Sequence, residues 1–300
     1  MTSLRRRSIP CASALALALT LAVTASGSST AGRWIVFSAH PDGSGLSQLF
    51  RVQTDGADLR QITTGRLPAT APAFSPDGTQ IVFSRLGSGI FRVNLDGTGL
   101  HRLTANVRDS QPVWSPDGAR IAFLRPYRTD WHVYTMSTSG AGQRRLAQGP
   151  AAGRPSWTRD SKAILAPSGG DVVKIDSQTG KVLTRFGMTI DIQIAHAATA
   201  SPDARMLAYV DPRRSTGPPD CGEGRCPQFG LYLASIPAPH RPRRIVNDTG
   251  PAGWSPDGKR LVFIATGVLT LRTVSSGAQT TIATGAHVPA GDSPPAWQPR

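Results

Sequence analysis

The sequence predicts an all-β fold, a six-bladed β-propeller with four-stranded blades. A phrase in which an aromatic residue precedes Ser-Pro-Asp-Gly, or a variant of it, recurs along the chain. The residues at the aromatic position are, in order, Phe74, Trp114, Trp157, Ala200, Trp254 and Trp297, and Ala200 is the one that is not aromatic. The spacings between them are 40, 43, 43, 54 and 43 residues. A period of about 40 to 45 residues with four strand-like pieces is typical of a propeller blade. The 31 glycines and 25 prolines among 300 residues fit many turns and short strands.

Each repeat contains strand patterns in the same order. Short apolar runs rich in branched and aromatic residues predict the second strand of each blade. These runs are residues 33–38, 80–85, 120–125, 162–167, 205–210 and 260–265. Segments of alternating polarity, such as "WHVYTMST" and "VLTLRTV", predict third strands, and shorter outer strands are expected at 100–105 and 143–148.

The Ser-Pro-Asp-Gly tetrapeptide predicts a turn between the inner and second strands. Proline presets φ at the second turn position, aspartate can accept hydrogen bonds from nearby backbone N–H groups, and glycine tolerates a positive φ. Because the turn recurs at the same place in five repeats, we interpret it as scaffold. Calcium binding is not expected, since the sequence has no D-x-D-x-D-G loop.

The two ends of the repeat region predict how the ring closes. Residues 33–38 read as a second strand that no tetrapeptide phrase precedes, whereas "PPAWQP" near the C-terminus is an inner-strand phrase that no strand follows. We therefore expect the segment around Trp297 to complete the first blade. Closure of this kind leaves no strand edge open to aggregation.

Residues 1–28 are predicted to be a signal peptide with a short linker, followed by the propeller over 29–300. Arg5, Arg6 and Arg7 precede an apolar run that extends from about Cys11 to Ala25, and small residues follow it. The run is shorter than the roughly 20 apolar residues of a membrane span, so no transmembrane segment is expected after its removal. The protein is expected to be exported, to the periplasm or outside the cell.

The chain carries a large positive formal charge. Loss of the three N-terminal arginines lowers the formal charge from +14 to +11. For an exported basic protein, acidic wall polymers, anionic lipid headgroups and acidic proteins are favoured over nucleic acid as partners, but a solvated surface excess is the favoured explanation of the charge.

The repeated phrases "FSPDGTQIVFSR" and "WSPDGKRLVFIA" resemble the WD-repeat-like propeller repeat of the TolB-like family, and "PPAWQP" is similar to the closing strand of TolB. The resemblance covers nearly all of residues 29–300 and implies a stand-alone propeller without the TolB N-terminal domain. Similar repeats occur in the propellers of prolyl-oligopeptidase-like peptidases, but the sequence contains no G-x-S-x-G nucleophile motif.

The candidate binding site lies where the loops between blades, and those between second and third strands, meet at the mouth of the channel. The residues expected there are Arg66, Arg108, Asp109, Tyr127, Arg128, Arg154, His196, Arg213, Arg214 and His287. The arginines would form a positively charged rim suited to a carboxylate. His196 and His287 with Asp191 and Asp292 offer an acid–base or metal alternative, but neither a metal nor another cofactor is expected.

The fifth repeat carries an insertion that contains Cys221 and Cys226. In an oxidising compartment this C-x4-C pair predicts a local disulfide, because a metal site would lack two ligands.

Function is expected to be non-enzymatic. No repeat gains a cluster of carboxylates, histidines or a nucleophile, which favours a monomeric binding scaffold that recognises a protein or an acidic envelope polymer. The alternative is a propeller-type enzyme, a lyase, lactonase or glycosidase, with its site at the channel mouth.

Overall fold

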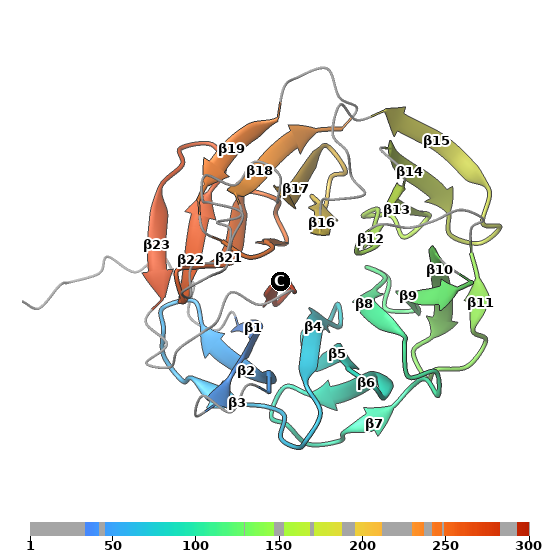
Figure 1. Ribbon diagram of the computed structural model, residues 1–300, viewed down its shortest axis with the longest axis horizontal. Helices are drawn as coiled ribbons and strands as arrows, with labels where there is room; N and C mark the ends of the chain where they lie inside the picture. Colours follow the sequence, from blue (N-terminus) through green and yellow to red (C-terminus); the bar gives the residue numbers. More distant parts are fainter. Residues whose placement is uncertain are drawn as a thin grey trace, which may run out of the picture. The chain divides into compact units, whose positions relative to one another are not determined.

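The computed structural model describes residues 34–41, 46–128, 130–146, 153–168, 171–187, 196–211, 230–236, 242–247, 249–282 and 293–299. These residues form six four-stranded antiparallel sheets. Figure 1 shows the sheets as the blades of a ring, with one strand of each blade facing the centre. The predicted six-bladed β-propeller is therefore confirmed. No helix of the described residues is long and apolar enough to cross a membrane.

Each blade runs from an inner strand at the centre of the ring to an outer strand at its rim (Figure 1). In that order, blade one consists of β24 (Ala296–Trp297), β1 (Trp34–Ala39), β2 (Gln48–Gln53) and β3 (Arg60–Gln61). Blade two consists of β4 (Ala69–Phe74), β5 (Gln80–Arg85), β6 (Gly89–Asn94) and β7 (His101–Arg102). Blade three consists of β8 (Ser110–Trp114), β9 (Arg120–Tyr127), β10 (Asp130–Ser137) and β11 (Arg144–Arg145).

The remaining blades follow the same order. Blade four consists of β12 (Ser156–Trp157), β13 (Ala163–Ser168), β14 (Asp171–Asp176) and β15 (Val182–Gly187). Blade five consists of β16 (His196–Ala200), β17 (Met206–Asp211), β18 (Gly230–Ser235) and β19 (Arg243–Val246). Blade six consists of β20 (Gly253–Trp254), β21 (Arg260–Ala265), β22 (Val268–Thr273) and β23 (Gln279–Ile282).

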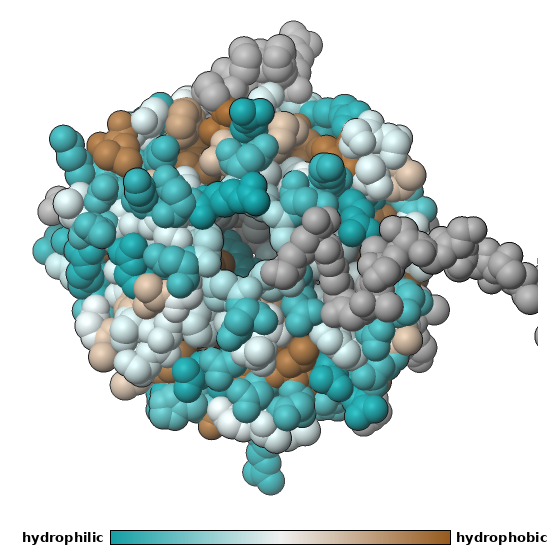
Figure 2. Space-filling model, turned by 180° about the vertical axis from the view of Figure 1, so that it is seen from behind, coloured by the Kyte–Doolittle hydropathy of each residue, from teal (hydrophilic) through white to brown (hydrophobic). Residues whose placement is uncertain are grey.

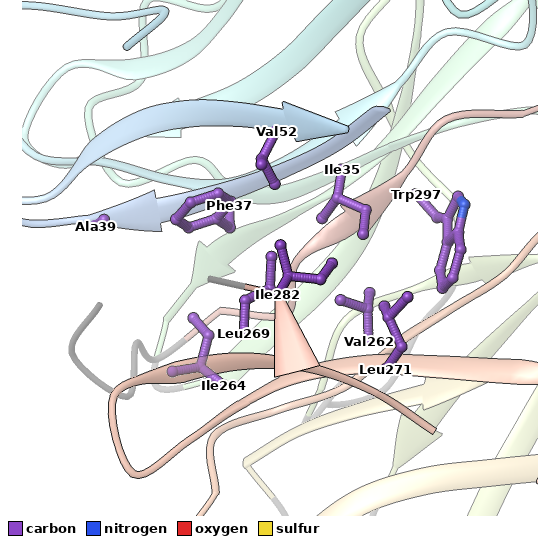
Figure 3. Packing of buried hydrophobic residues seen from close by; sticks show 10 residues of the cluster. All are labelled: Ile35, Phe37, Ala39, Val52, Val262, Ile264, Leu269, Leu271, Ile282 and Trp297. Atoms are coloured by element: carbon purple, nitrogen blue, oxygen red, sulfur yellow. The ribbon is translucent and has the colours of Figure 1, made fainter. Parts of the chain in front are cut away.

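The hydrophobic core is divided among the interfaces between neighbouring blades. Six clusters of buried residues each combine the second and third strands of one blade with the strands of the next. This follows from the sequence pattern, because a strand buried on both faces is apolar almost throughout. The last cluster joins blade six to blade one and contains Val262, Leu269, Ile35, Phe37 and Trp297 (Figure 3).

The ring closes through the C-terminal strand, as predicted. Ile35 and Val36 of β1 pair with Trp297 and Ala296 of β24. The next residue, Gln298, donates its backbone N–H to the carbonyl of Trp34 at 2.9 Å and its Nε2 to the carbonyl of Gly78 at 3.0 Å. The C-terminal segment therefore fastens blade one and also contacts the first tetrapeptide turn of blade two.

The tetrapeptide turns use one hydrogen-bond pattern in five blades. In the first turn, the Ser75 hydroxyl donates to Asp77 Oδ1 at 2.6 Å, and Asp77 Oδ1 also accepts from the backbone N–H of Thr79 at 3.0 Å. The equivalent pairs are Ser115 with Asp117, Thr158 with Asp160, Ser201 with Asp203, and Ser255 with Asp257. The fourth turn residue has a positive φ in every copy, between 58° and 71°. The sequence interpretation of these turns as scaffold agrees with this geometry.

Candidate binding site at the channel mouth

Connections on two sides of each blade divide the propeller into two faces. The tetrapeptide turns join inner to second strands and define the turn face. The loops from outer to inner strands, with the hairpins between second and third strands, lie at the other ends of these antiparallel strands and define the mouth face. Figure 2 shows one face of the propeller, where hydrophilic side chains surround a hollow at the centre of the ring.

The predicted site residues fall into three groups. Arg66, Arg108, Asp109, Tyr127, Arg128 and Arg154 all lie in mouth-face loops or at their ends. His196 begins β16, but its side chain is outside the described part of the chain. Arg213, Arg214 and His287, together with Cys221 and Cys226, also fall outside the described ranges, so their predicted roles stay predictions.

Blade three has an extended hairpin at the mouth. Its second and third strands, β9 and β10, have eight residues each, whereas those of the other five blades have six. The extra pairs are Trp131 with Pro126 and Asp130 with Tyr127. Arg128 follows in the left-handed region at φ 57°, where the hairpin turns. The extension places the aromatic residues Tyr127 and Trp131 at the mouth end of this hairpin.

Arginines surround these aromatic rings. Arg145 Cζ lies 4.7 Å from the centre of the Tyr127 ring, Arg128 Cζ lies 5.7 Å from the same ring, and Arg108 Cζ lies 6.0 Å from the centre of the Trp131 ring. Such distances permit cation–π attraction. We call Arg108, Tyr127, Arg128, Trp131 and Arg145 the blade-three cluster.

The cluster is open to solvent and basic. Tyr127 is 43% exposed and Trp131 is 36% exposed. Within the described ranges, none of the three cluster arginines forms an ion pair. Asp130 is exposed beside Trp131 in the sequence and reduces the local excess to two positive charges. Exposed aromatic and arginine side chains that lie together are the residue types most enriched at binding hot spots.

Asp109 holds the cluster together instead of facing solvent. Its buried carboxylate accepts from Arg125 Nε at 2.6 Å and from Arg125 Nη2 at 2.7 Å. The hydrogen bond to Asp109 raises the pKa of Arg125, against a smaller opposing effect of burial. Because Asp109 follows Arg108 in the β7–β8 loop and Arg125 lies in β9, this two-pronged pair fixes the loop against the hairpin.

Arg154 differs from the predicted rim because its side chain is buried, with only 6% of the residue exposed. Its Nη2 donates to the carbonyls of Pro72 at 2.8 Å and Pro112 at 3.1 Å. Arg66, by contrast, lies exposed in the loop between β3 and β4. The structure therefore assembles the exposed basic surface around blade three and places Arg154 inside the ring.

Sequence reasoning missed Trp131, Arg145 and Arg125 as members of the site. Trp131 stands at the start of a predicted third strand, and Arg145 falls within a predicted outer strand, so both were explained by the fold. The available signal was the longer apolar and aromatic stretch of the third repeat, which predicts a longer hairpin.

The carboxylates and histidines of the described residues do not gather into a metal-binding cluster. No group of three or more His, Cys, Asp or Glu side chains in the described ranges is arranged to hold a metal ion. The aspartates of the tetrapeptide turns are engaged by hydroxyl and backbone donors, and Asp109 is paired with Arg125.

Comparisons with known proteins agree with this architecture. Residues 66–217 match the TolB beta propeller domain family. The chain is 32% identical over 119 residues to the Tol-Pal system protein TolB of Anaeromyxobacter dehalogenans, which is 38% of this chain and 27% of that protein. It is also 32% identical over 123 residues to a TolB homolog of Chlorobaculum tepidum, covering 39% of this chain and 27% of that protein. These matches span about a quarter of the length of the relatives.

A solved structure has the same fold. The crystal structure of TolB from Acinetobacter baumannii superposes with a TM-score of 0.71 at 19% identity, covering 90% of this chain and 67% of that one. At this identity the similarity shows the fold alone. The family match extends over half of the sequence, and the six-bladed ring with its C-terminal closing strand fits it. The chain therefore belongs to the TolB β-propeller domain family.

Proposed function

We propose that this propeller is a non-enzymatic binding scaffold, which recognises an acidic protein partner through the blade-three cluster at its mouth. The observation that carries the proposal is the cluster itself, in which exposed Tyr127 and Trp131 lie among three arginines without carboxylate partners in the described ranges. Aromatic rings supply contact area, and arginine supplies two-pronged hydrogen bonds to carboxylates.

A protein partner fits better than a uniformly charged polymer. A polyanion needs only an even spread of positive charge, whereas this surface concentrates large apolar rings beside its charges. The two bacterial relatives are named for TolB, and one of them is called a Tol-Pal system protein, which supports a role alongside other proteins. An acidic envelope polymer is the competing partner.

A pull-down from envelope extract tests the proposal. The bait is the chain without residues 1–28, compared with an Arg108→Ala/Arg128→Ala variant. The matched control is Arg159→Ala/Arg205→Ala, which removes two exposed charges from the turn face. We expect the cluster variant to lose a protein that the parent and the control both retain, and the parent's binding to weaken as salt rises.

The outcomes separate the alternatives. Loss of the same protein from the turn-face control, with both variants folded, would place the binding surface on the turn face and contradict the proposal. Capture that survives protease treatment of the extract, but not removal of its polysaccharides, would identify an envelope polymer instead.

We also propose that the signal peptide is cleaved near Ala25 on export and that the propeller of residues 29–300 functions in the periplasm or outside the cell. The basic start and apolar run of the N-terminal segment support this. Mass spectrometry of the protein exported by its natural host should show a new N-terminus near residue 25. Recovery of the intact chain from the cytoplasm would contradict export.

The third proposal is a disulfide between Cys221 and Cys226. Their spacing permits the Cα separation of about 4.4 to 6.8 Å that a disulfide needs. Titration of the unfolded, unreduced exported protein should find no free thiol. Two free thiols would exclude the bond.

A further inference from the structure

The central channel contains one charged residue among six equivalent positions. The position three residues before the aromatic of each repeat lies at or just before the inner strand. It is occupied by Ala71, Gln111, Arg154, Ala197, Pro251 and Pro294 in order. Five of these residues carry no charge and four of them are alanine or proline. Arg154 is therefore a feature of a single blade and no part of the repeat.

The contacts of Arg154 place its guanidinium in the wall of the channel. The residue enters β12 of blade four, while its two acceptors, the carbonyls of Pro72 and Pro112, lie in the inner strands of blades two and three. Blade three stands between the other two blades (Figure 1). A side chain that reaches from blade four to blade two must therefore pass along the inner side of blade three.

Local irregularities make these two carbonyls available. Ala71 and Gln111, which precede the prolines, have φ values of 53° and 54°, and the pairing of each inner strand shifts register at this point. A bulge leaves the extra residue out of the ladder and turns it away from the partner strand. The carbonyls of Pro72 and Pro112 thus point away from their own sheets and accept from Arg154.

Among the described residues, the guanidinium has donors without an acceptor and no counter-charge. Of its five N–H groups, the two on Nη2 are engaged, while Nε and Nη1 donate to no described residue. No carboxylate among the described residues pairs with it. Burial lowers the pKa of Arg154 to about 10, so the group is still a cation at neutral pH. Arg125, by contrast, is matched by Asp109.

We propose that Arg154 is an anion-binding residue of the central channel and takes a carboxylate group that enters from the mouth. A buried cation without a counter-charge is costly, and a carboxylate on Nε or Nη1 would offset that cost through charge-assisted hydrogen bonds. The carboxylate belongs either to a small organic acid or to an acidic side chain of a protein segment.

The test measures carboxylate binding on the intact propeller. The side-chain Nε–H resonance of Arg154, assigned through its own side-chain carbons, is followed by NMR while sodium acetate replaces sodium chloride at constant ionic strength. In parallel, the melting temperature is recorded for the parent and for Arg154→Met. We expect a saturable shift of the resonance and a rise in melting temperature that the variant lacks, with the Kd raised at least about tenfold.

A second variant locates the site. Arg108→Ala/Arg128→Ala should keep the acetate response, because the channel site is separate from the blade-three cluster. The variant also distinguishes a failure of the carboxylate proposal for Arg154 from a failure of the protein binding proposed for the blade-three cluster. The absence of a saturable shift in the parent with both acetate and a short glutamate peptide, or equal stabilisation of Arg154→Met, would overturn the proposal. The NMR measurement needs no variant, so it holds even if Arg154→Met does not fold.

Repeating the titration with a short glutamate peptide distinguishes the two sources of the carboxylate. A response to acetate alone identifies a small organic acid as the ligand. A response that requires the peptide identifies an acidic protein segment. Both results support a carboxylate site at Arg154.

Discussion

The turn face and the mouth face of this propeller use polar side chains in opposite ways. On the turn face, a hydroxyl, an aspartate and backbone N–H groups satisfy one another, and the same set recurs in five blades. On the mouth face, the described second and third strands are longest in blade three, and three arginines there have no carboxylate partner in the described ranges. Repetition thus marks the groups that stabilise the ring, and departure from the repeat marks the groups available for binding.

Deleting residues 293–300 should have the largest effect on stability, because it disrupts the ring that carries both the turn face and the mouth face. The deletion removes Trp297 from the core between blades six and one and the Gln298 contact to the turn at Gly78. Loss of a buried aromatic alone costs about 3 to 5 kcal/mol. We expect a large fall in the melting temperature of the whole propeller in a calorimetric scan.

The control for this deletion is removal of Arg300 alone, which leaves β24 and Gln298 in place. That protein should melt like the parent. If the longer deletion also melted within a degree or two of the parent, the ring would not depend on its C-terminal strand.

Asp109→Ala should have the next largest effect on stability. It tests whether a mouth-face carboxylate can stabilise the fold as the turn-face carboxylates do, because Asp109 is buried and paired with Arg125. The change leaves Arg125 without its two-pronged partner, and loss of a hydrogen-bonded charge pair costs about 2 to 3 kcal/mol. Urea unfolding measures the loss of stability. Combining Asp109→Ala with Arg125→Leu should recover part of it, and no recovery would show that Asp109 acts through other contacts.

The sequence predicted the frame of the molecule better than its site. The repeat period, the turns and the closing strand were all predicted, because each depends on local chemistry that occurs several times. Of the outer strands expected at 100–105 and 143–148, the described residues form short strands at His101–Arg102 and Arg144–Arg145, and residues 147 and 148 lie outside the described ranges.

The site residues depend on contacts between distant segments. Arg108 meets Trp131 only because the Asp109–Arg125 pair fixes one loop against a hairpin. The burial of Arg154 depends on bulges at Ala71 and Gln111, which a pattern of apolar and polar residues does not reveal. Arginine is rarely buried without a partner, so the sequence alone favoured an exposed position.

Ala204→Gly should produce a smaller change, in the stabilising direction. Ala204 ends its turn at φ 58°, whereas Gly78, Gly118 and Gly258 occupy the same position in other blades at 69° to 71°. Left-handed backbone costs a residue with a Cβ atom about 1 to 2 kcal/mol, part of which the greater freedom of glycine in the unfolded chain cancels. We expect a gain of about 0.5 to 1 kcal/mol in urea unfolding, with partner binding unchanged. Gly258→Ala, the reverse change, should lower the free energy of unfolding by a similar amount. If both variants were as stable as the parent, the turns would carry no backbone strain.

The pH dependence of stability should give the smallest effect and tests whether the turn carboxylates stabilise the fold at all. The hydrogen bond from Ser75 holds the pKa of Asp77 below its ordinary value of 3.8, and hydroxyls on Thr158 and Ser201 do the same for Asp160 and Asp203. A carboxyl group whose pKa is lower in the folded than in the unfolded state stabilises the fold above the unfolded value, and this contribution disappears as the pH falls through the folded value. Stability from these groups should therefore be constant between pH 7 and 5 and fall below about pH 4.

Urea midpoints measured from pH 7 to about pH 2.5 should show a shallower fall for Ser75→Ala than for the parent, because the variant has already lost the donor that lowers the pKa of Asp77. If the urea midpoints of the parent and Ser75→Ala fell in parallel with pH, the Ser75 hydroxyl would contribute nothing to stability through the Asp77 carboxylate. The repeated turns would then stabilise the propeller through their backbone geometry alone.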